Sequence, residues 1–227
     1  MRWEVPEYMR RRFNILIGIV VIAAILQACG VKPAPQEACN FVQNSEQQRV
    51  SWGAQVPVVF LISSYVPPES RGQVDVSQYY EAIRAAAHVW NEAIGREVIR
   101  IGGVTDEMPN YGRDQVNLIS FIVDWNGNSA EQARTTINWV GSRIYEADIY
   151  INVRDFRYFA GDEPGENEVD MMSLMIHEFG HALGLRHIDT PQSVMQPTLA
   201  SASRFMPQNA FRRKLSEVDL NSIRCEY

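Results

Sequence analysis

The chain has 227 residues, of which 46% are hydrophobic and 21% are charged. This composition is ordinary for a globular protein, and the length suits one catalytic domain with a leader. The formal net charge is −6, and the body of the chain has no sustained basic stretch. Composition therefore argues against a nucleic-acid partner, and we expect a monomer.

A secretory leader is predicted at the N-terminus. Three arginines at 10–12 precede an uncharged apolar run, 13–28, which is rather short for a membrane-spanning helix. The run ends in Leu-Gln-Ala-Cys, which resembles a bacterial lipobox and implies cleavage before Cys29 and lipidation of its thiol. We expect residues 1–28 to be a lipoprotein signal peptide and the protein to be lipid-anchored in the bacterial cell envelope, at the outer membrane or cell surface. The alternative is an uncleaved single-span anchor.

Residues 29–50 are predicted to form a flexible tether, because their Pro, Gln, Asn and Glu leave few apolar groups to bury. If Cys29 is lipidated, Cys39 and Cys225 remain as an even pair. An oxidising compartment would let these two cysteines bond. The bond would tie the start of the domain to its last residues and close a long loop.

Residues 51–227 are predicted to form one domain. The apolar run 56–62 predicts a buried strand. Apolar residues then recur at helical spacing over 76–94, with Asp75 as the cap and Gly95 at the stop. Three or four strands are expected next, with candidates at 97–102, 115–124, 133–140 and 143–152, and the third candidate is polar enough to be an edge strand.

The C-terminal third is predicted to contain two more helices. A loop over 154–167, rich in Gly, Asp and Glu, leads to a helix that starts near residue 167 or 168. Its methionines are expected in the core rather than on a metal. A closing helix is expected over 216–225, with Ser216 as its cap and Asp219 in its first turn.

Within the first of these helices, an eleven-residue stretch has the pattern H-E-x-x-H-x-x-G-x-x-H. His177 and His181 are four residues apart and share one helix face. Gly184 can take the left-handed conformation that ends a helix, so the chain can turn and bring back His187. Three neutral imidazoles leave the fourth tetrahedral position of Zn²⁺ open to water, as in a catalytic site. Glu178 is placed to act as general base on that water.

This motif is followed by a candidate Met-turn at 193–197, which contains Met195. Together they resemble the metzincin metallopeptidases and look most like the matrixins, the matrix metalloproteinase family. The resemblance implies an α+β domain with a twisted, mostly parallel sheet, an antiparallel edge strand, two long helices and a C-terminal helix. It also implies a zinc endopeptidase whose Met195 packs beneath the histidines. A protein or peptide substrate would pair with the edge strand, here Ala133, Arg134, Thr135, Thr136, Ile137 and Asn138.

The chain departs from the matrixin pattern in several places. Pro197-Thr198-Leu199 stands where matrixins usually have Pro-x-Tyr, and only His88 is spare for a second zinc, so that zinc is not expected. His88 itself is expected on the helix surface or partly buried. Calcium could bind the loops that contain Asp124, Asn126, Asp162 or Glu163, although acidic loops are more often simply solvated.

Three alternatives remain open at this point. Cys39 could be an inhibitory zinc ligand as in the matrixin pro-segment, although its context, Glu-Ala-Cys-Asn-Phe, lacks the Pro-Arg-Cys-Gly pattern. The protein could also be an envelope-assembly or binding module that keeps the zinc fold without cutting, although the intact Glu178 argues against that. A peptidase that acts on cell-wall peptides would differ only in its substrate.

Overall fold

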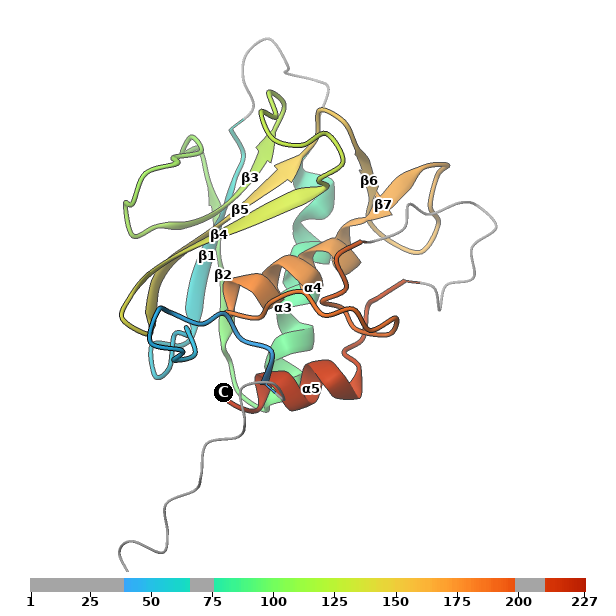
Figure 1. Ribbon diagram of the computed structural model, residues 1–227. Helices are drawn as coiled ribbons and strands as arrows, with labels where there is room; N and C mark the ends of the chain where they lie inside the picture. The colour runs from blue at the N-terminus through green and yellow to red at the C-terminus, as the bar shows by residue number, and fades with distance from the viewer. Residues whose placement is uncertain (1–38, 66–75, 199–210) are drawn as a thin grey trace, which may run out of the picture. The chain divides into compact units, whose positions relative to one another are not determined.

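The computed structural model describes residues 39–65, 76–198 and 211–227 (Figure 1). The predicted signal peptide, Cys29, Asp75 and Leu199 lie outside these residues. In chain order the described elements are β1 (Val58–Ser63), the 3-10 helix η2 (Val76–Tyr79), α3 (Tyr80–Ile94), β2 (Ile99–Thr105), β3 (Asn117–Ile122), β4 (Ala133–Val140), β5 (Arg143–Asn152), β6 (Arg157–Phe159), β7 (Glu168–Asp170), α4 (Met171–Ala182) and α5 (Glu217–Ile223). Within the described ranges no helix is both long and apolar enough to cross a membrane.

The main sheet has five strands in the order β2-β1-β3-β5-β4. β1, β2, β3 and β5 pair in parallel, whereas β4 pairs with β5 antiparallel and, among the described residues, has no strand on its other side. The predicted α+β fold is confirmed, including the mostly parallel sheet and the edge strand at residues 133–140. The polar sequence of β4 suits this place, because an edge strand keeps one side in contact with solvent.

Helices α3 and α4 pack against one face of the sheet and against each other (Figure 1). The indole of Trp90 in α3 donates to the carbonyl of Ile176 in α4 at 2.9 Å. From the sheet, the ring of Phe60 lies 5.4 Å from that of Phe179, centroid to centroid. All four residues are fully buried. Met175 is also fully buried on α4, as expected for a core methionine.

The opposite face of β5 carries buried carboxylates. Glu146 and Asp148 are both buried, because the segment before β3 covers this face. The backbone N–H of Gln115 donates to Glu146, and that of Leu118 donates to Asp148 at 3.0 Å. Burial raises the pKa of Asp148 to about 7.

The start of α4 differs from the sequence-based expectation. The helix begins at Met171, where the side chain of Asp170 caps it by accepting from the backbone N–H of Ser173 at 3.1 Å. A helix cannot run through Asn167, whose φ is +61°. Residues 168–170, between Asn167 and the helix, form β7, which pairs with β6. Because β6 lies at 157–159, the predicted loop over 154–167 contains a short strand.

The other helix boundaries agree more closely with the prediction. The first helical turn of the segment expected over 76–94 is the 3-10 helix η2, and α3 follows it with Tyr79 at the N-cap. Gly95 ends α3 with a φ of +79°. At the C-terminal end, Ser216 and Asp219 form a capping box at the start of α5.

The predicted flexible tether over 29–50 is wrong for its described part, residues 39–50. Cys39, Phe41 and Val50 are fully buried. The structure joins Cys39 to Cys225 by a disulfide, with the Cα atoms 5.8 Å apart. The segment is mostly polar, but its few apolar side chains are all used in the core, which composition alone does not reveal.

Candidate active site

Helix α4 and the turn after it bring the predicted metal ligands together. His177 and His181 lie one turn apart on α4, which ends at Ala182. Gly184 then takes a φ of +103°, and a Cβ atom there would lie 2.3 Å from the carbonyl oxygen of Val50. Only glycine fits this turn, and the turn returns the chain so that His187 faces the other two rings.

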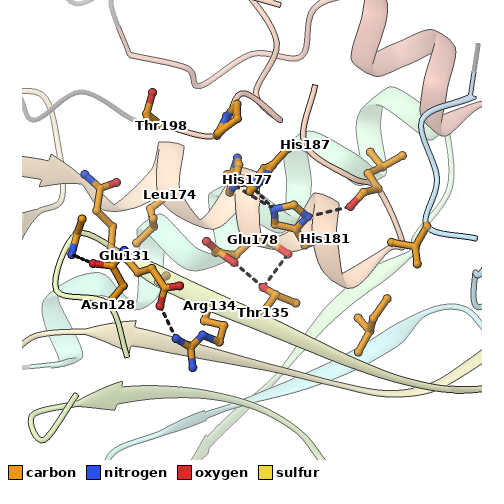
Figure 2. Close-up of a pocket in the computed structure, with 17 residues that line it drawn as sticks. Asn128, Glu131, Arg134, Thr135, Leu174, His177, Glu178, His181, His187 and Thr198 are labelled. Atoms are coloured by element: carbon orange, nitrogen blue, oxygen red, sulfur yellow. Dashed lines mark hydrogen bonds and ion pairs between the residues drawn. The ribbon is translucent and has the colours of Figure 1, made fainter. Parts of the chain in front are cut away.

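The three imidazoles converge through their Nε2 atoms (Figure 2). Nε2 of His181 lies 3.1 Å from that of His177 and 3.0 Å from that of His187, and the remaining pair is 3.2 Å apart. A tetrahedral Zn²⁺ at about 2.0–2.1 Å from each nitrogen would hold the nitrogens about 3.3 Å apart. The three rings therefore fit one zinc ion, and they form the group of three side chains found among the described residues that could hold a metal ion.

In two of the rings the second nitrogen, Nδ1, is hydrogen-bonded to a backbone carbonyl. Nδ1 of His177 lies 2.6 Å from the carbonyl oxygen of Val194, and Nδ1 of His181 lies 2.8 Å from that of Leu185. A carbonyl only accepts, so each Nδ1 carries the proton and each Nε2 presents its lone pair. Burial lowers the pKa of both histidines to about 4. Both rings are therefore neutral near pH 7, which is the form that binds a metal.

Glu178 lies beside the histidines and is 4% exposed. The hydroxyl of Thr135, on β4, donates to its Oε2 at 2.5 Å (Figure 2). Burial raises the pKa of Glu178, while the nearby His181 and the Thr135 hydrogen bond act in the opposite direction. The carboxylate is therefore shielded from solvent and lines the same cavity as the three histidines.

Met195 packs beneath the site, as the resemblance implied. A Cβ atom at Gly180 would lie 2.3 Å from the Met195 sulfur, so a glycine between the two α4 ligands makes room for this side chain. The Met195 carbonyl accepts from the backbone N–H of Ile188 at 2.9 Å, directly after the third histidine. The Met-turn and the turn that carries His187 are thereby joined.

Helix α5 is joined to the Met-turn by hydrogen bonds. The carboxylate of Asp219 accepts from the hydroxyl of Ser193 at 2.5 Å and from the backbone N–H of Val194 at 3.1 Å. Sequence reasoning gave Asp219 only the role of an anion near a helix N-terminus. Its bond to Val194 supports the carbonyl that orients His177, and no local pattern in the sequence marks this contact between segments 25 residues apart.

A cavity of about 460 Å³ runs between β4, the histidines and the chain after the Met-turn. Of the six predicted edge-strand residues, four line it, namely Ala133, Arg134, Thr135 and Ile137. Thr136 and Asn138 are not among the lining residues, and the Asn138 amide instead donates to Glu146 at 2.8 Å. Leu174, Pro197 and Thr198 also line the cavity, as does Val42 from the segment that was predicted to be a tether.

The structure gives no support to the other predicted metal sites. Of the proposed calcium-binding loops, the one with Asp162 is engaged by Arg213 at 3.0 Å. In the described part of the chain, no group of three or more His, Cys, Asp or Glu ligands other than the histidine trio was found. His88 is exposed and lies 3.4 Å from Glu92 on the same helix. Cys39 is in a disulfide, so its sulfur is not available as an inhibitory ligand here.

The sheet, the two packed helices and the three-histidine site with its Met-turn define a metzincin-like domain. The family model for matrixin, peptidase family M10, matches residues 52–227, which is more than half of the chain. The chain therefore belongs to the matrixin family.

Individual relatives match parts of the chain. Rat macrophage metalloelastase is 41% identical over 58 residues, which are 26% of this chain and 11% of the relative. Mouse matrix metalloproteinase-25 is 50% identical over 32 residues, 14% of this chain and 5% of the relative. Human matrix metalloproteinase-20 is 26% identical over 175 residues, 75% of this chain and 31% of the relative. The chain thus spans less than a third of the length of any of these three relatives.

Proposed function

We propose that this protein is a zinc-dependent endopeptidase in which His177, His181 and His187 hold the metal and Glu178 is the general acid–base. The observation that carries the proposal is the convergence of three Nε2 atoms within 3.0–3.2 Å of one another beside a buried carboxylate. When bound, zinc would polarise the scissile carbonyl and lower the pKa of a water toward neutrality. Three protein ligands leave a position for these groups.

Glu178 would move the proton in both halves of the reaction. It would take a proton from the attacking water and deliver it to the leaving nitrogen of the cleaved bond. Its burial raises its pKa, which makes the carboxylate a stronger proton acceptor than an exposed one. Its place on α4, next to His177, fixes it within the same cavity that would hold the substrate.

The substrate would lie extended along the free side of β4. Main-chain pairing with an edge strand holds many sequences in one direction and register. Side-chain preference would come from the part of the cavity lined by Leu174, Pro197 and Thr198. The apolar Leu174 and the small Thr198 favour an uncharged side chain in this part.

The test is cleavage of a casein or peptide library by the purified protein. We expect cleavage that a chelator abolishes and added Zn²⁺ restores. Glu178→Gln should keep one zinc per chain and lose cleavage by about two to four orders of magnitude, the usual size of an acid–base contribution. Cleavage by Glu178→Gln at the rate of the natural chain would contradict the proposed role. A zinc-loaded protein that cuts nothing would favour the alternative, a non-catalytic envelope module.

We further propose that the domain is held at a membrane by a lipid on Cys29. The support is the sequence alone: three arginines, a short apolar run and Leu-Gln-Ala-Cys. In a bacterial host the natural chain should incorporate labelled fatty acid and enter the membrane fraction, and Cys29→Ser should take up no label. Equal labelling of both chains would contradict a lipid on this cysteine.

A further inference from the structure

The edge strand contributes a polar side chain to the proposed general base. Thr135 lies in β4, where its hydroxyl donates to Oε2 of Glu178 at 2.5 Å and lies 3.3 Å from the backbone carbonyl of the same residue (Figure 2). A threonine hydroxyl has one proton to donate. A carboxylate is a stronger acceptor than a peptide carbonyl, and the contact with Oε2 is also the shorter one. The proton is therefore directed to Oε2.

The pairing of β4 with β5 fixes the position of Thr135 relative to the sheet. Thr135 stands opposite Ile149 in the β4–β5 pairing, so its backbone is fixed on one side by a central strand. Ala133 and Ile137, two residues away in each direction, line the same cavity but carry no hydroxyl. Thr135 is therefore the side chain of this strand face that can donate to a carboxylate.

Because Glu178 is buried, its carboxylate depends on the hydrogen bond from Thr135 for both stability and orientation. The residue is 4% exposed, and a buried carboxylate without a donor loses more solvation than the fold returns. A carboxylate also rotates about its last side-chain bond, which has broad minima. A hydrogen bond to one named oxygen selects one orientation, and this leaves the other oxygen in a defined place.

We propose that Thr135 is a positioning residue that anchors Oε2 of Glu178, so that Oε1 is the oxygen that exchanges the proton with the attacking water. This inference rests on the proposed peptidase function. It also means that one strand would serve two purposes, because the backbone of β4 would hold the substrate while the Thr135 side chain orients the base.

The first test separates turnover from substrate binding. Thr135→Val keeps the shape and removes the hydroxyl. We expect kcat to fall by about 10- to 100-fold, the range for loss of a hydrogen bond to a charged group, with KM changed by less than about threefold. Thr135→Ser keeps the hydroxyl and should restore kcat to within about threefold of the natural enzyme. Thr105→Val, at the opposite edge strand β2, should leave kcat unchanged.

Two results of this test would overturn the proposal. One is an unchanged kcat in Thr135→Val. The other is an equal loss in Thr135→Ser and Thr135→Val, because the methyl group rather than the hydroxyl would then be responsible. Zinc content should be one per chain in all variants, so that a lost metal is not mistaken for a misplaced base.

The second test does not depend on activity. Urea unfolding of the metal-free full chain is compared for the natural protein, Thr135→Val, Glu178→Ala and the double variant. Thr135→Val should lower the midpoint clearly in the natural background and much less when Glu178 is absent, because the two side chains are coupled. Equal shifts in both backgrounds would contradict the contact. A coupled pair in a protein that cleaves no peptide would instead contradict the proposed function alone.

Discussion

Gly184→Ala should disrupt the turn that delivers the third histidine. Gly184 has a φ of +103°, and an added Cβ would lie 2.3 Å from the carbonyl oxygen of Val50 and 3.2 Å from the Phe41 ring. Relief of this contact requires the segment 42–50 to move away from the turn. That movement would break the hydrogen bond from the backbone N–H of Val42 to the Gly184 carbonyl, now 2.8 Å long.

The stability that Gly184→Ala should lose is the sum of two separate costs. A left-handed backbone costs a non-glycine residue about 1–2 kcal/mol, and overpacking of a filled interior adds about 1–3 kcal/mol. Gly184→Ala should therefore lower the free energy of unfolding by about 2–5 kcal/mol. Gly95→Ala is a matched control, because Gly95 also has a positive φ, +79°, but its Cβ would meet no atom within 4 Å. The control should cost about 1–2 kcal/mol.

The assay is urea unfolding of the metal-free protein, followed by fluorescence of its tryptophans. The difference between the two variants isolates the contact with Val50 from the backbone cost that they share. Gly184→Ala should also bind zinc more weakly, since the turn carries His187 and the Leu185 carbonyl that holds His181. If Gly184→Ala unfolds at the same urea concentration as Gly95→Ala, the steric reasoning is wrong.

Three further predictions concern other parts of the domain. Gly180→Ala would place a Cβ 2.3 Å from the Met195 sulfur and 3.1 Å from the Trp90 ring; the overpacking cost of about 1–3 kcal/mol should exceed the roughly 0.5–1 kcal/mol by which alanine favours a helix interior, and a higher urea midpoint than that of the natural protein would contradict this packing. Burial raises the pKa of Asp148 from 3.8 to about 7, so the folded protein keeps a proton there that the unfolded chain loses. The natural protein should therefore lose stability relative to Asp148→Asn as the pH rises from about 4 to 7, and a pH-independent difference would argue against it. Reduction of the Cys39–Cys225 bond, which spans 186 residues, should lower stability by about 3–5 kcal/mol; identical melting with and without reductant would show that the bond contributes nothing.

Much of the fold could be predicted because its strands and helices differ in hydrophobic period. The continuous apolar run of β3 marked a central strand, and the polar β4 marked an edge. The helical spacing in α3 was equally clear. The start of α4 was less clear, since its limit is set by the positive φ of Asn167 and the cap at Asp170. Composition in the preceding loop does not encode either feature.

The metal-binding side chains could be predicted because all three lie within one short motif. A helix places His177 and His181 together, and a glycine turn returns His187, so local geometry decides most of this site. The residues that were missed come from far along the chain. Asp219 reaches the Met-turn from α5, and Val42 reaches the cavity from the N-terminal segment.

The Thr135 hydroxyl illustrates the same limit on a smaller scale. Its strand was predicted from the sequence to be the edge that pairs with a substrate, and strand alternation predicts that Thr135 shares a face with Ala133 and Ile137. Its pairing with Glu178 depends on how close β4 lies to α4. That distance is set by the packing of the core, which no pattern in either segment specifies.

The most direct test of the account is the coordination of zinc in the loaded protein. An X-ray structure with anomalous data at the zinc edge would show which protein atoms bind the ion. We predict one zinc per chain, bound by Nε2 of His177, His181 and His187, with a non-protein ligand at the fourth position. An ion that misses any of these three nitrogens, or a fourth protein ligand on it, would contradict a catalytic site here.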